Sequence, residues 1–147
     1  MLTDGDAIRN LLGRYCDLVD DGDWDSVGAL FADGALATSD GSLLARGADE
    51  VAAFYRKGTL LHGDAGSPRT KHLVLNTTLT FLDESAVACS SYVVLQAVDG
   101  ALALQPIICG RYVDTFVRVG LAWQWTERRF SVDLAGDLSQ HLSYRLT

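Results

Sequence analysis

The sequence predicts an α+β domain in which three helices precede a long, mostly antiparallel sheet. Between residues 4 and 57, apolar side chains recur every three or four positions, which is the helical period. After residue 70 the chain becomes rich in Val, Leu, Thr, Tyr and Trp, and only short turns separate four long apolar runs. Short turns between long strands are typical of an antiparallel meander. A chain of 147 residues, 48% of them hydrophobic, is the size of one compact domain, so we expect a single domain over residues 1–147.

The first helix is expected over residues 4–21. Thr3 followed by Asp6 resembles a capping box, and an acidic residue in the first turn suits the positive end of the helix dipole. Asp20 falls at the opposite end, where the dipole disfavours an anion, so this side chain is either solvated or held by a partner. The sequence Asp21-Gly22-Asp23 then interrupts the helix. Its apolar stripe consists of Ile8, Leu11, Leu12, Tyr15 and Val19.

Two shorter helices and a hairpin are expected before the sheet. Residues 24–31 repeat the helical period in a second, short helix. Asp40-Gly41 is a turn signal between two short apolar runs, which favours a small hairpin. Residues 48–57 form the third predicted helix, and Gly58 is its expected stop.

Four strands are expected in the second half of the chain, and polar residues fall inside them. Strict alternation places His72 and Asn76 on one face of the first strand. A sheet packed on helices has an apolar inner face, so polar residues at inward positions need a reason. The expected strands are residues 71–82, 86–98, 101–117 and 121–134, and the other polar residues inside them are Gln96, Tyr112, Asp114 and Arg128.

Charge and composition exclude several classes of function. The formal net charge is −7 and there is no polybasic cluster, so we expect no nucleic-acid partner. No apolar run approaches the ~20 residues that a membrane-spanning helix needs. The first residues lack the basic start and apolar stretch of a secretion signal, which predicts a cytoplasmic protein. The three cysteines lack metal-ligand spacing and no glycine-rich phosphate loop is present, so no metal and no cofactor are expected.

A series of short motifs spread over nearly the whole chain resembles the SnoaL-like family, within the nuclear-transport-factor-2-like superfamily. The resemblance implies a cone-shaped α+β barrel, in which a curved, mostly antiparallel sheet wraps on three N-terminal helices. It also implies a homodimer or homotrimer, since open sheet faces in this superfamily usually pair. The motifs are residues 11–20, 22–24, 30–31, 69–72, 110–114 and 123–129.

The resemblance extends to residues that catalyse eliminations. Scytalone dehydratase, bile-acid 7α-dehydratase and hexachlorocyclohexane dehydrochlorinase share a histidine on the first long strand and an aspartate at the end of the first helix; His72 and Asp20 match these positions. Tyr15 matches a catalytic tyrosine of the bile-acid dehydratase, and Arg128 matches the arginine that receives the halide in the dehydrochlorinase. The chain also departs from scytalone dehydratase, because Gln96 stands where that enzyme has a second catalytic histidine.

These residues predict cofactor-free acid–base chemistry. If Asp20 holds one ring nitrogen of His72, the other nitrogen points into the cone as a general base. Tyr15 would donate a hydrogen bond to a developing oxyanion, and Arg128 would hold an anion or leaving group. The expected activity is that of a lyase or isomerase, by dehydratase-like elimination or by a double-bond shift. The expected substrate is a small, largely apolar or aromatic metabolite, up to polycyclic size. Substrate-binding positions expected in the cone are Trp24, Phe31, Phe54, Asn76, Tyr92, Gln96, Tyr112 and Asp114.

Other interpretations of the same residues stay open. A lone strand histidine is commonly a structural residue, and an arginine can bury its stem and expose its head. A polyketide-type cyclase or epoxide hydrolase would use Asp20 or Asp133 on water or on a ring oxygen. A non-catalytic small-molecule-binding module is the alternative of another class, because this fold also carries binding proteins. An open pocket with His72 at its floor favours the enzyme.

Overall fold

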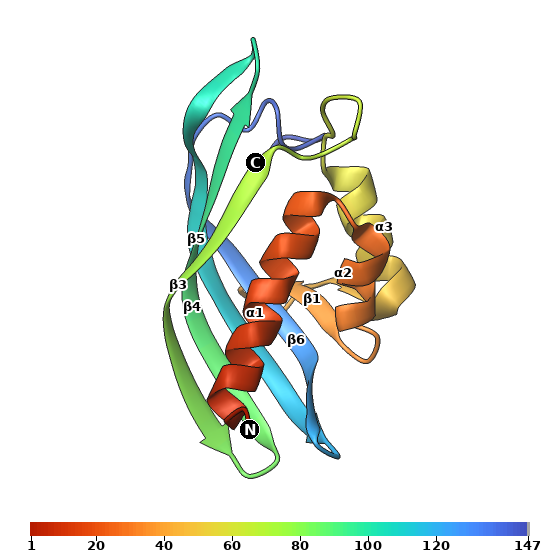
Figure 1. The fold of residues 1–147 in the computed structure, drawn as a ribbon, viewed down its shortest axis with the longest axis vertical. Helices are drawn as coiled ribbons and strands as arrows, with labels where there is room; N and C mark the ends of the chain where they lie inside the picture. The colour runs from red at the N-terminus through yellow and green to blue at the C-terminus, as the bar shows by residue number, and fades with distance from the viewer. Residues whose placement is uncertain (147) are drawn as a thin grey trace.

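The fold has two layers, with three helices covering one face of a curved, unclosed six-stranded sheet (Figure 1). It is seen in a computed structural model that describes residues 1–146. The strand order is β2-β1-β6-β5-β4-β3, and every neighbouring pair is antiparallel except β1 and β6, which are parallel. The predicted α+β architecture is thus confirmed. Its elements are α1 (Asp4–Asp21), α2 (Trp24–Leu30), β1 (Ala35–Thr38), β2 (Leu43–Arg46), α3 (Gly47–Gly58), β3 (Thr70–Leu82), β4 (Ser85–Val98), β5 (Leu102–Val119) and β6 (Ala122–Ala135).

Helix α1 begins and ends at the residues that its sequence predicts. The Thr3 hydroxyl accepts a hydrogen bond from the Asp6 amide at 3.1 Å, which caps the first turn. Gly22 ends the helix with φ at 70°, a left-handed conformation that glycine adopts without strain. The apolar stripe packs into the core, which places Tyr15 and Asp20 over the inner face of the sheet. Among residues 1–146, none of the helices is long and apolar enough to cross a membrane.

Removing the Thr3 cap is expected to destabilise the fold modestly. Thr3→Ala leaves the Asp6 amide without its side-chain acceptor and lowers the free energy of unfolding by about 1 kcal/mol. Thr3→Ser keeps the hydroxyl and is the matched control. Urea unfolding of both variants measures the difference, and equal free energies of unfolding for Ala and Ser would contradict the capping role.

An irregularity in β3 decides which of its side chains face inward. The register with β4 shifts between Leu75 and Thr78, and Asn76 lies there with φ at 56°. The alternation therefore changes phase: His72 faces inward before the shift, and Thr77 faces inward after it. Asn76 is exposed, so its predicted place on the substrate-binding face is wrong. Strict alternation over the whole strand cannot anticipate an inserted residue.

A second irregularity, in β6, places two residues on the inner face although they are three positions apart, an odd spacing that regular alternation puts on opposite faces. The register with β5 shifts between Thr115 and Phe116, opposite the Trp125–Glu127 segment. As a result both Trp125 and Arg128 are buried on the inner face. An arginine enters the core at this point, directly opposite Asp114 of β5.

Candidate active site

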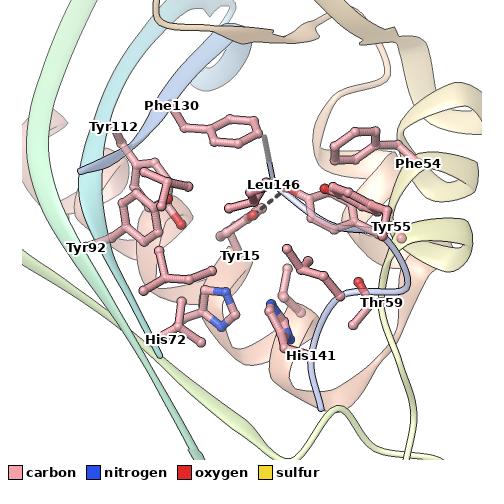
Figure 2. A pocket seen from close by; sticks show the side chains of 17 residues that line it. Tyr15, Phe54, Tyr55, Thr59, His72, Tyr92, Tyr112, Phe130, His141 and Leu146 are labelled. Carbon is pink, nitrogen blue, oxygen red and sulfur yellow. Dashed lines mark hydrogen bonds between the residues drawn. The ribbon is translucent and has the colours of Figure 1, made fainter. Parts of the chain in front are cut away.

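A cavity of about 110 Å³ lies between the inner face of the sheet, helices α1 and α3, and the segment that follows β6. Its lining is mostly aromatic, and Figure 2 shows these rings around the space with two imidazoles side by side at one edge. The aromatic side chains lining it are Tyr15, Phe54, Tyr55, Tyr92, Tyr112, Phe130 and Tyr144, and the imidazoles are His72 and His141.

Asp20 and His72 form a buried pair. The Nδ1 atom of His72 lies 2.6 Å from Oδ1 of Asp20, and the two side chains are 7% and 9% exposed. An ionised carboxylate can only accept, so Nδ1 is the donor. His72 lines the cavity while Asp20 lies behind it, away from the cavity lining. The other nitrogen, Nε2, therefore carries the lone pair of an imidazole that lines the cavity.

The surroundings of Asp20 explain an acidic residue at the carboxyl end of a helix. Its oxygens accept hydrogen bonds from the Thr70 hydroxyl at 2.8 Å and from the His72 backbone amide at 2.9 Å, besides the imidazole. All three donors come from the start of β3, where the strand passes the end of α1. A partner does hold this carboxylate, and three donors fix its orientation.

Two tyrosine hydroxyls meet at the cavity. Tyr15 of α1 and Tyr55 of α3 are hydrogen-bonded at 2.5 Å, and both side chains line the space (Figure 2). Burial raises the pKa of Tyr15, and burial raises that of Tyr55 further, so both phenols stay protonated at neutral pH. One of the two hydroxyl protons is left over after their mutual bond. The pair can therefore donate a hydrogen bond to a bound oxygen.

Tyr92 and Tyr112 form the wall on the sheet side. Their rings are stacked, with centroids 4.1 Å apart and planes 2° from parallel. Gly110 makes this possible, because a Cβ atom there would come within 2.7 Å of the Tyr92 ring. The Tyr92 hydroxyl donates to the Ser131 carbonyl at 2.9 Å, which fixes the ring.

Arg128 lies behind this wall and does not line the cavity. Its side chain is 0% exposed and forms a two-point ion pair with Asp114, at 2.7 and 3.0 Å. The guanidinium carbon is 4.2 Å from the centroid of the Tyr15 ring and 3.6 Å from that of Tyr112. These rings separate it from the cavity. The expectations that Arg128 holds a leaving group and that Asp114 binds substrate are therefore wrong for this structure.

Several other predicted site residues have structural positions instead. Trp24 stacks on the outer side of Tyr55, and Phe31 is fully buried in the core; neither lines the cavity. Gln96 is also buried away from the cavity, and its amide donates to the carbonyls of Pro68 and Gln140. Asp133, the alternative carboxylate, is exposed. The predicted residues that do line the cavity are Tyr15, Phe54, His72, Tyr92 and Tyr112.

Sequence reasoning missed His141 and the segment that carries it. Residues 138–146 cross from the end of β6 to the end of α3, and four of them line the cavity. His141 is 6% exposed, and its ring centroid lies 6.5 Å from that of His72. The sequence does contain a signal for this segment, because Leu142, Tyr144 and Leu146 are spaced two residues apart. Such spacing indicates an extended segment that covers an apolar surface.

His141 predicts a loss of stability in mild acid. Burial, reinforced by His72, lowers its pKa to about 4, whereas the unfolded chain titrates near 6.5. Above pH 6.5 both states are neutral; as the pH falls from about 6.5 to 4, the unfolded state binds a proton that the folded state does not. Stability falls in that window by up to about 3 kcal/mol. Urea unfolding near pH 7 and pH 4.5 measures this change. The free energy of unfolding should fall less between the two pH values for His141→Phe than for the wild type. Equal falls in the two proteins would contradict the role of His141 in this pH dependence.

Comparisons with known proteins show the family and the fold of this chain. The family model of the SnoaL-like domain matches residues 1–129, and the chain belongs to this family. A search of curated proteins finds no match. Within residues 1–146, no three His, Cys, Asp or Glu side chains are grouped as they would be around a metal ion.

Solved structures share the fold over most of the chain. An NTF2-like protein with a cystatin-like fold from Novosphingobium aromaticivorans is 24% identical, with a TM-score of 0.70, over 93% of this chain and 86% of that one. A candidate scytalone dehydratase from the same organism is 21% identical, with a TM-score of 0.72, over 96% and 87%. ActVI-ORFA from Streptomyces coelicolor is 21% identical, with a TM-score of 0.70, over 86% and 95%. Together with the family match, they show a SnoaL-like domain that shares its fold with these proteins.

Proposed function

We propose that the protein is a cofactor-independent lyase or isomerase that removes a proton from carbon next to a carbonyl group. The observation that carries this proposal is the oriented His72–Asp20 pair at the edge of an apolar cavity. An imidazole held by a buried carboxylate is a general base suited to neutral pH. The family match and the candidate dehydratase among the related folds support the same class of reaction.

The reaction needs only side chains of this chain. Nε2 of His72 takes the α proton, the electron pair of the C–H bond forms a C=C bond, and the carbonyl π pair moves to oxygen. Asp20 stabilises the imidazolium that forms, because its carboxylate is 2.6 Å from Nδ1. The hydroxyl pair of Tyr15 and Tyr55 donates to the oxyanion. Return of the proton to another carbon gives a double-bond shift, and departure of a β substituent gives an elimination.

The size of the cavity limits the substrate. A volume of about 110 Å³ is close to the roughly 150 Å³ cavity that holds a benzene ring and below the 300–1,000 Å³ typical of pockets for larger ligands. With the segment 138–146 in place, the substrate class is therefore a single-ring or similarly small carbonyl compound. A polycyclic substrate is too large for a cavity of this volume.

Exchange of protons with solvent tests the proposal without knowledge of the natural substrate. Cyclohexanone and cyclohex-2-en-1-one are incubated in D₂O with the protein, and loss of the α-proton signals is followed by proton NMR. We expect exchange faster than in buffer and faster than with the His72→Ala variant. Binding of the ketones without faster exchange would instead support the non-catalytic binding module.

The cyclase or epoxide-hydrolase alternative has less support from the geometry. Such chemistry uses a carboxylate that faces the bound molecule. Among the described residues, Asp20 is turned toward His72 and lies outside the cavity lining, and Asp133 is exposed. None of the Asp and Glu side chains within residues 1–146 lines the cavity.

A further inference from the structure

We propose that His141 is a second catalytic residue, which binds the leaving oxygen of a β-hydroxy carbonyl substrate opposite His72. The inference rests on the proposed function and extends it, because it assigns the class of substrate and the group that leaves. It concerns a residue outside the strands and helices, brought to the cavity by the segment 138–146.

His141 lies at the cavity beside His72. It lines the same cavity as His72, and the two rings are tilted by 60° with centroids 6.5 Å apart (Figure 2). That separation leaves room for a substrate atom within reach of both rings. The His141 side chain is more than nine-tenths buried, yet its Nδ1 has no hydrogen-bond partner among the described residues. Buried polar atoms are rarely left unpaired, so Nδ1 of His141 is available to a molecule bound in the cavity.

Hydrogen bonds to other parts of the chain hold the segment 138–146 in place. The Gln140 carbonyl accepts from the Gln96 amide at 2.9 Å and contacts Nε2 of His62 at 2.6 Å. The His141 carbonyl accepts from the Leu60 amide at 2.8 Å, and the Ser143 amide donates to Gly58 at 3.0 Å. Both flanks of His141 are therefore fixed. The hydrogen bond from Gln96 to the Gln140 carbonyl also gives a reason for a buried polar residue at position 96.

The charged and titratable groups around His141 keep it neutral. Burial and the neighbouring His72 and His62 disfavour its protonation, and Asp20, which favours it, lies beyond His72. A neutral imidazole can both donate and accept, which suits a hydroxyl that becomes a water molecule. His72 differs because its Nδ1 lies 2.6 Å from the Asp20 carboxylate, whereas the ring of His141 has no carboxylate at that distance among the described residues. Two imidazoles in unlike environments favour a division of roles between them.

The elimination balances with these groups. Nε2 of His72 takes the α proton, the C–H electron pair forms the C=C bond, and the C–O bond breaks with its pair on oxygen. The departing oxygen takes the proton from the His72 imidazolium, so water leaves and His72 returns to its neutral form. His141 hydrogen-bonds this oxygen throughout and gains or loses no proton overall.

Two reactions of related probes separate His141 from His72. α-Proton exchange of cyclohexanone in D₂O has no leaving group, whereas conversion of 3-hydroxycyclohexan-1-one to cyclohex-2-en-1-one, followed by ultraviolet absorbance, has one. For His141→Phe we expect elimination to fall at least about tenfold more than exchange, since one hydrogen bond to developing charge is lost. His141→Asn, which can still donate and accept, should recover part of the elimination. Thermal unfolding verifies that both variants are folded.

The outcomes distinguish this inference from the proposed function. If the wild type exchanges cyclohexanone, but His141→Phe lowers both reactions equally or neither, the proposed role of His141 is refuted. The proposal that His72 is the general base then still stands. Exchange by the wild type without elimination also refutes it. If the wild type catalyses neither reaction, the proposed function fails and this inference with it.

Discussion

Asp20→Asn is expected to lower α-proton exchange by about 10²–10⁴-fold while the fold is retained. This is the range that a positioned general base contributes, and an amide cannot replace the carboxylate here. The Asp20 side chain accepts from three donors, namely the His72 imidazole, the His72 amide and the Thr70 hydroxyl. An asparagine turns its own N–H groups toward at least one of them. The His72 ring then loses both its orientation and the charge that stabilises its imidazolium.

The matched controls are Asp17→Asn and Asp21→Asn, on the same helix. Both carboxylates are exposed, so each variant makes the same change in charge away from His72. Initial exchange rates of cyclohexanone measure the effect, and a proton–nitrogen NMR spectrum verifies folding. A folded Asp20→Asn protein with a rate within threefold of either control would show that Asp20 does not act on the base.

Arg128→Met is expected to lower the free energy of unfolding by about 3–5 kcal/mol. Removing one member of a buried ion pair leaves the other as an uncompensated charge. Both Arg128 and Asp114 are 0% exposed, and the guanidinium also packs against Tyr15 and Tyr112. Among the described residues, the Asp114 carboxylate then keeps only its hydrogen bond from the Trp125 indole, at 3.0 Å. Domains are stable by only about 5–15 kcal/mol, so this variant is near the limit of folding.

Arg129→Met is the matched control, one residue along the same strand. Arg129 pairs with Glu127 at 2.6 Å, but its side chain is 42% exposed, and exposed pairs contribute about 0–1 kcal/mol. Urea unfolding of both variants gives the comparison. An Arg128→Met protein as stable as Arg129→Met would mean that the buried pair contributes little, and the assignment of Arg128 to stability would be wrong.

The Asp20–His72 pair is visible in the sequence because both residues depart from what their local sequence favours. Asp20 stands at the end of a helix that disfavours an anion, and His72 stands inside an apolar strand. Each of these side chains needs a polar partner, and in the structure each is the partner of the other. The helices and strands themselves follow from periodicity and turn residues, which depend only on neighbours in the chain.

The remaining site residues depend on contacts that local patterns do not encode. The shifts of register in β3 and β6 change which side chains face inward, and this moves Asn76 out to solvent. The side chains of Arg128 and Tyr112 both face inward, but only Tyr112 lines the cavity, and Arg128 lies behind it. The pattern of inward and outward residues does not distinguish these two positions. His141 reaches the site through a segment without regular structure, whose path is set by hydrogen bonds to distant residues.

The rate of α-proton exchange by His72→Ala, with and without added imidazole, tests the general base most directly. The substitution removes the ring and leaves space beside the Asp20 carboxylate, where free imidazole can bind. We expect exchange of cyclohexanone to be lost in the variant and partly restored by imidazole in a saturable manner. A folded His72→Ala protein that exchanges cyclohexanone at the wild-type rate would contradict it.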